Sequence, residues 1–206
     1  MTDSNFIGML PDIEESRRIF QAAAILDAIL MPEWEYRYYS YNAHWDENEQ
    51  MASMRDGEGD HYFALFQPNG LIIKGFDQRF NQVHGPHDVL QGVPNEFEGF
   101  LREPALIMDV TTFCTWKLQG SQAWSASKEL DAEAYKLLHV LNGKADYYYA
   151  WATEYYEISL DRSLVQRIFD IEPLDGKMLK GLNEELEFAD LEEDIQEIGY
   201  PVKRED

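Results

Sequence analysis

Five titratable residues around one predicted hairpin are the strongest candidates for chemistry in this sequence. They are Asp56, Asp60, His61, Lys74 and Asp77. A histidine beside a carboxylate can act as a general base, and a nearby cation can hold an anionic substrate group. This combination suits a hydrolase-type reaction. The alternative is that these acids solvate a glycine-rich connection and pair with a neighbouring arginine, because structural ion-pair clusters are common.

The hairpin is predicted by two apolar runs, residues 61–66 and 71–76, which flank the turn sequence Gln-Pro-Asn-Gly at 67–70. Proline presets φ for a turn, and Asn-Gly tolerates positive φ. In the first run, apolar side chains would point to both faces of the strand. We therefore expect a central hairpin that is covered on both faces.

The register of this hairpin decides which candidates meet. A type I turn with Gly70 as a G1 bulge pairs His61 with Asp77 and places Phe63 over Gly75. Asp77 would then orient His61 for proton transfer at the open end of the hairpin. No nucleophile elbow, P-loop or metalloprotease motif accompanies this predicted site.

Two further residues are candidates for binding. Arg55 opens the loop that leads into the hairpin and could hold an anionic group. Trp45 lies among polar residues, and tryptophan is enriched at interaction surfaces. The period-two pattern of residues 34–42 predicts a tyrosine-rich strand, in which we expect Trp34 and its neighbours to join the core. Trp45 is the expected exception.

A metal site and a reactive thiol are both disfavoured. His84, His87 and Asp88 have the side-chain types that bind zinc, but the intervening Gly and Pro do not give helical spacing and no third ligand set is evident. We expect a solvent-facing loop there, and neither a metal nor a cofactor. Cys114 falls in a predicted strand and should be a small core residue.

The pattern of elements predicts an α+β fold. An apolar helical stripe runs from the acidic start near Asp12 to Pro32, and helical spacing returns after residue 125. We expect an antiparallel sheet with a central hairpin, covered by the N-terminal helix and by a helical C-terminal half. The expected organisation is a single domain, 1–206, with a sheet-rich part (1–125) and a helical part (126–206).

The charge of the chain restricts its partners. Seventeen Lys and Arg residues stand against 39 Asp and Glu residues, a net charge of -22. Nucleic acid and anionic membrane surfaces would be repelled, whereas a basic protein would be attracted. One cysteine and no signal-peptide pattern indicate a cytoplasmic protein.

These observations lead to three functional hypotheses. The first is a non-enzymatic acidic binding protein, immunity or antitoxin-like, that occludes a basic protein partner. The alternative is the hydrolase-type enzyme at the hairpin. A third is a scaffold whose helical part offers an oligomer surface.

Three phrases of the sequence resemble a family of uncharacterised bacterial proteins. They are Ser53-Met54-Arg55-Asp56-Gly57-Glu58-Gly59-Asp60, Lys74-Gly75-Phe76-Asp77 and Ile198-Gly199-Tyr200-Pro201. In the family the second phrase continues with His-Glu-Ser, whereas this chain has Gln78-Arg79-Phe80. The resemblance implies a bacterial cytoplasmic protein and no established reaction.

Overall fold

The computed structural model describes residues 6–203 and shows an α+β fold. Six strands in that range form one antiparallel sheet whose spatial order follows the sequence. They are β1 (Tyr39–Asp46), β2 (Glu49–Arg55), β3 (His61–Gln67), β4 (Gly70–Phe76), β5 (Phe113–Leu118) and β6 (Ser125–Ala126).

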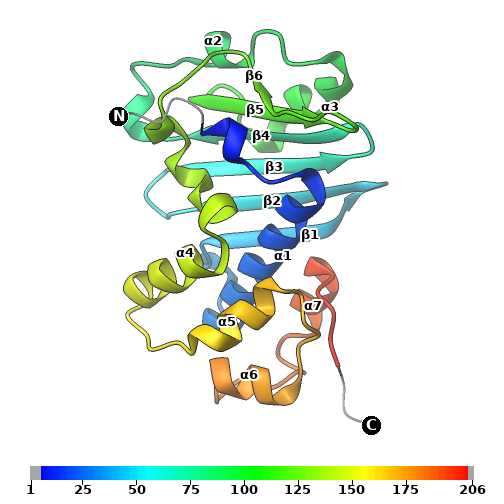
Figure 1. Cartoon of the computed structure of the whole chain (residues 1–206), viewed down its shortest axis with the longest axis vertical. Coiled ribbons are helices and arrows are strands. Elements are labelled where there is room, and N and C mark those ends of the chain that lie inside the picture. The colour runs from blue at the N-terminus through cyan, green and yellow to red at the C-terminus, as the bar shows by residue number, and fades with distance from the viewer. Residues whose placement is uncertain (1–5, 204–206) are drawn as a thin grey trace.

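The helices gather in two groups around this sheet. They are α1 (Ile13–Leu30), α2 (Pro86–Leu90), α3 (Glu98–Arg102), α4 (His139–Tyr155), α5 (Arg162–Phe169), α6 (Gly176–Leu182) and α7 (Glu192–Ile198). Figure 1 shows α4 to α7 around the β1 end of the sheet, and α2 and α3 near β4 and β5. None of the helices within residues 6–203 is long and apolar enough to cross a bilayer.

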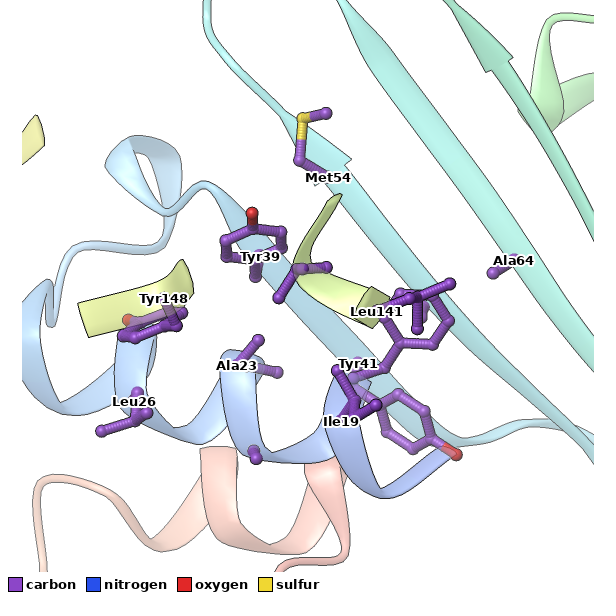
Figure 2. Packing of buried hydrophobic residues seen from close by; sticks show 14 of the residues in the cluster. Ile19, Ala23, Leu26, Tyr39, Tyr41, Met54, Ala64, Leu141 and Tyr148 are labelled. Carbon is purple, nitrogen blue, oxygen red and sulfur yellow. The ribbon is translucent and has the colours of Figure 1, made fainter. Parts of the chain in front are cut away.

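Helix α1 forms where the sequence predicts it. The Asp12 side chain caps its first turn by accepting the N–H of Glu15 at 2.8 Å. Its apolar stripe packs on the first face of the sheet, and Figure 2 shows Ile19 and Ala23 facing the β1 tyrosines. Small residues in this stripe let the helix lie close to the sheet.

The predicted hairpin is confirmed as β3 and β4, and it is covered on both faces. Tyr62, Ala64 and Phe66 belong to the core cluster beneath α1 and α4. Phe63 and Leu65 belong to a second cluster on the opposite face, where the connection 78–112 covers the sheet. Cys114 is also buried in this second cluster, as expected for a small core residue.

The predicted register of the hairpin is wrong by one residue. Gly70 pairs directly with Gln67, so it lies within the ladder and adds no bulge residue. His61 therefore faces Phe76 and not Asp77. Gly75 is covered by a phenylalanine, but that residue is Phe113 of β5.

The predicted strand 34–42 begins later than expected. Residues Trp34–Tyr36 form a 3-10 helix, and β1 starts at Tyr39 and continues to Asp46. The backbone N–H groups of Tyr38 and Tyr39 donate to the carboxylate of Asp27, which fixes the entry into β1. The residues before that point turn outward, and the expectation that Trp34 joins the core is wrong.

Two features of the C-terminal half position later parts of the chain. The range given for α4 contains two helical pieces that meet at a kink at Lys144, whose φ is 50°, directly after Asn142-Gly143. After α7 the chain returns to Leu174, whose N–H donates to Pro201 O while its carbonyl accepts from Lys203 N. These two hydrogen bonds join the chain before α6 to the chain after α7.

Candidate functional site

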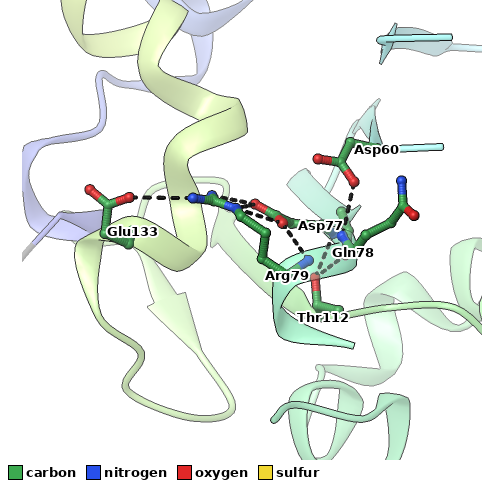
Figure 3. A network of polar contacts seen from close by, with 7 residues as sticks. Asp60, Asp77, Gln78, Arg79, Thr112 and Glu133 are labelled. Atoms are coloured by element: carbon green, nitrogen blue, oxygen red, sulfur yellow. Dashed lines mark hydrogen bonds and ion pairs between the residues drawn. The ribbon is translucent and has the colours of Figure 1, made fainter. Parts of the chain in front are cut away.

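The open end of the hairpin does bring the acidic loop beside the segment that ends at Asp77. Asp60 accepts the N–H of Gln78 at 2.9 Å, and the Gln78 amide donates to Glu58 O at 2.8 Å. Figure 3 shows the contact between Asp60 and Gln78 and the contacts of Asp77 with Arg79 and Thr112. Asp77 is fully buried and binds the Arg79 guanidinium, with the shortest contact at 2.6 Å. The predicted proximity is confirmed, but these polar groups bind one another.

The pKa values of the two acids follow from these contacts. Burial raises the pKa of Asp77, and hydrogen bonds from Arg79 outweigh that effect, so its pKa lies below the ordinary value. Burial raises the pKa of Asp60 despite the hydrogen bond from Gln78. Asp77 is thus a stable internal anion and a poor proton acceptor.

His61 lies on the opposite face of the sheet from Asp77 because of the observed register. Its Nδ1 is 2.9 Å from Gly59 O, and its Nε2 is 3.1 Å from the Lys74 ammonium. Since Lys74 can only donate, Nε2 is the acceptor and Nδ1 carries the proton. Burial lowers the pKa of His61. Both ring nitrogens are therefore occupied, and the predicted pair with Asp77 does not form.

Lys74 has no solvent exposure. Its three ammonium protons meet His61 Nε2, Ile107 O and Val110 O at 3.1 to 3.3 Å. Burial lowers its pKa to about 8. An amine enclosed in this way cannot hold an anionic substrate group unless the connection that contains Ile107 opens.

We expect amine acylation of the native protein to test that enclosure. Lys128 and Lys177 are exposed and should react rapidly, while Lys74 should remain unmodified because reagent cannot reach it. Peptide mass spectrometry after brief treatment with an acylating reagent measures the rates. Labelling of Lys74 at a rate close to that of Lys177 would show that the cover opens.

The remaining predicted residues also have internal contacts or lie elsewhere. Asp56 caps its own loop by accepting the N–H groups of Glu58 and Gly59. Trp45 is 40% exposed near the far end of β1. In the described part of the chain no group of three or more His, Cys, Asp or Glu residues could hold a metal, and His87 is exposed.

A cleft of about 650 Å³ lies on the same face of the sheet as Lys74, at the β1–β2 edge. Ser40 pairs with Ser53, Ser53 with Phe63, and Phe63 with Lys74, so these residues form one row across the sheet. The two serines line the cleft. The cleft is open at this edge because the two serines are small, whereas Phe63 and Lys74 fill the corresponding space further along the row.

The walls of this cleft are aromatic. They come from the 3-10 helix Trp34–Tyr36 and from residues 155–157 at the end of α4. Seven large hydrophobic side chains are exposed within residues 6–203, and Trp34, Tyr36 and Tyr155 account for three of them. A hollow that gathers exposed aromatic groups is a candidate interaction site.

A buried carboxylate holds these walls together. Asp27 is fully buried, and its oxygens accept the Tyr38 and Tyr39 N–H groups and the Tyr148 and Tyr156 hydroxyls, at 2.5 to 2.9 Å. It thus joins α1, the start of β1 and α4. Burial raises its pKa to about 6, although each hydrogen bond acts in the opposite direction.

The raised pKa gives Asp27 an unusual effect on pH dependence. The folded state takes up this proton near pH 6, whereas an unfolded aspartate does so near 3.8, so ionisation of Asp27 opposes folding. Wild type should gain about 1 kcal/mol of unfolding free energy relative to Asp27→Asn as pH falls from about 7.5 to about 5. Denaturant titrations at the two pH values measure this difference. Equal pH dependence in both proteins would contradict the assignment.

The charged groups of the cleft are unevenly paired. Arg37 binds Asp194 of α7 and the carbonyls of Met31 and Pro32. Glu35 and Glu157 also line the cleft, and neither forms an ion pair or a hydrogen bond with a described residue. The site therefore has free carboxylates at its rim.

Two predicted site residues, Arg55 and Asp56, line this cleft. The side chain of Arg55 is exposed and contacts two aromatic rings. Its guanidinium carbon lies 5.6 Å from the Trp34 ring centroid and 5.7 Å from that of Phe63. No carboxylate among residues 6–203 pairs with it. Stacking on aromatic rings is what positions this cation.

An acidic segment, residues 184–197, adjoins the cleft through the Arg37–Asp194 ion pair. It contains eight Asp and Glu residues and no Lys or Arg: Glu184, Glu185, Glu187, Asp190, Glu192, Glu193, Asp194 and Glu197. It adds negative potential beside the aromatic walls.

Of the candidates named from the sequence, Arg55 and Asp56 line this cleft, whereas Trp34, Tyr36 and Tyr155 were not named for a site. One signal was present. Asp27 is the lone charge in the longest apolar run, and a buried acid must find donors. Two of its donors, Tyr38 and Tyr156, line the cleft. No protein-family model, curated protein sequence or solved structure matches this chain significantly.

Proposed function

We propose that the chain is a bacterial, cytoplasmic, non-enzymatic binding protein that occludes a basic protein partner, in the manner of an immunity protein or antitoxin. The observation that carries this proposal is the cleft, which combines exposed aromatic walls with carboxylates that have no internal partner. Bacterial origin and cytoplasmic location rest on the sequence resemblance and on the single cysteine.

Charge supports a basic partner. The net charge of -22 includes the acidic segment, which lies beside the cleft. Complementary charge accelerates diffusional encounter and makes it sensitive to salt. The same field would repel polyanions.

The aromatic walls support a protein partner in particular. Tryptophan and tyrosine are the residues that most often dominate binding energy at protein interfaces, because they bury a large area with few rotatable bonds. Trp34 and Tyr36 lie more than half exposed in the free protein. A partner side chain that covers them would remove apolar surface from water.

The contacts at the hairpin favour binding over a hydrolase-type reaction. Asp77 is neutralised by Arg79, His61 is occupied by Lys74 and Gly59, and Lys74 is enclosed. A general base needs a free nitrogen or oxygen within reach of a substrate proton. These three groups are instead taken up by contacts within the protein.

Selection from a displayed library of random peptides tests the proposal. The immobilised protein should enrich Lys- and Arg-containing peptides at low salt and release them at high salt, because screening weakens charge attraction. A variant with Glu184, Glu185 and Glu187 changed to Gln should enrich them less. A selected pool with no excess of basic residues would overturn the proposal.

A further inference from the structure

We infer that the anchor taken up by the cleft is an arginine side chain, stacked on Trp34 and paired with the carboxylates of Glu35 and Glu157. Arg55 holds that place when no partner is bound. This inference rests on the proposed function, because it names the group of the basic partner that the cleft recognises.

The Trp34 ring already receives a guanidinium group. Arg55 lies over it at 5.6 Å from the ring centroid. The chain contains 39 Asp and Glu residues, yet Arg55 forms no ion pair with any carboxylate of residues 6–203. The rings of Trp34 and Phe63, and not a salt bridge, are therefore what retain a cation at this position.

The carboxylates at the rim provide the second half of the recognition. Glu35 and Glu157 line the cleft without ion-pair partners in the described structure. A guanidinium is planar and offers parallel N–H donors to a carboxylate while its face stacks on a ring. An ammonium offers a strongly hydrated point charge and fits this combination less well.

The backbone at Glu157 is strained in a way that fits a binding role. Glu157 has a φ of 53° directly after the last turn of α4. Glycine adopts this left-handed conformation freely, and glutamate does not. Glutamate occupies a position whose backbone would suit glycine, and this residue lines the cleft.

The charge of the lining excludes an anionic ligand. Arg37 is already bound by Asp194, so it presents no free cation. Glu35, Asp56 and Glu157 then outnumber Arg55 among the lining residues. A cationic group is attracted, and displacement of Arg55 removes the positive charge of this lining that has no ion-pair partner among the described residues.

Calorimetric titration with two short peptides of equal length, one of arginine and one of lysine, tests the inference. The arginine peptide should bind more tightly than the lysine peptide. Trp34→Leu should weaken the arginine peptide about tenfold and abolish the preference. Trp45→Leu is the matched control, because Trp45 is also exposed but is not among the residues that line the cleft; it should leave both affinities unchanged.

Two further variants distinguish stacking from general attraction. Arg55→Met should tighten binding of the arginine peptide about threefold, because the Trp34 face becomes free and a like charge is lost. Glu157→Gly should weaken it about fivefold while the melting temperature stays equal or rises, since glycine suits the left-handed position. A loss of affinity in Glu157→Gly therefore cannot be attributed to unfolding.

The outcomes separate this inference from the proposed function. Equal binding of both peptides, unaffected by Trp34→Leu and reversed by salt, would overturn the arginine anchor and leave the acidic binding protein supported. Binding of neither peptide at low salt would overturn both. Weaker binding in Arg55→Met would show that Arg55 contributes to the ligand site and does not compete for it.

Discussion

We expect Asp27→Ala to destabilise the protein by about 4 kcal/mol, because each buried donor left without an acceptor costs ~1–3 kcal/mol. Asp27 receives two backbone N–H groups, from Tyr38 and Tyr39, and two hydroxyls, from Tyr148 and Tyr156. The hydroxyls can rotate toward other acceptors, but the backbone groups cannot. Chemical denaturation with fluorescence detection measures the loss.

Asp27→Asn is the matched control for this experiment. Its side-chain oxygen can accept the donors that reach one carboxylate oxygen, and its amide can donate to Tyr148 in place of the other. We expect less than half of the destabilisation seen with alanine. Equal losses in both variants would mean that charge, and not the set of hydrogen bonds, determines the stability at this position. The alanine variant should also lose the cleft, because Tyr38 and Tyr156 both line it.

The second large effect is expected from Gly70→Ala. Gly70 has a φ of 147°, and an added Cβ would lie 2.2 Å from Lys117 O and 2.9 Å from Leu118 Cα. Both atoms belong to the backbone of β5, which cannot move without breaking its pairing with β4. Overpacking and backbone strain together should cost about 3 kcal/mol.

Gly99→Ala serves as the comparison. Gly99 lies in α3, and a Cβ there meets no atom within 4 Å. Alanine is the better helix former, so this variant should be at least as stable as wild type. Thermal unfolding of the two variants side by side measures the difference. A Gly70→Ala protein as stable as Gly99→Ala would show that the turn can shift away from β5.

The hairpin could be predicted because its information is local. Pro68, Asn69 and Gly70 specify a turn, and apolar residues on both sides specify two covered strands. The register could not be predicted in the same way. Whether Gly70 bulges or enters the ladder depends on the close approach of Lys117, which lies far along the chain in β5. The one-residue difference moved His61 and Asp77 to opposite faces.

The cleft was missed for a related reason. The alternation that includes Trp34 and Tyr36 has the period of a strand, and nothing local shows that the strand starts at Tyr39. Asp27 decides this through a contact between helix and backbone. The hydrophobic periods of strands (2) and helices (3.6) predict only which face of one element is buried. They cannot predict a buried acid that binds several elements at once.

The return of the chain to Leu174 has a consequence for how a partner would meet the acidic segment. The Pro201–Leu174 and Lys203–Leu174 hydrogen bonds hold the chain shortly after this segment, and Arg37 holds the segment itself through Asp194. Its carboxylates thus lie on a structured surface whose shape is fixed before a partner binds. The acidic segment therefore loses little conformational entropy when a partner binds. Added electrolyte should then slow the arrival of a partner far more than it shortens the lifetime of the complex.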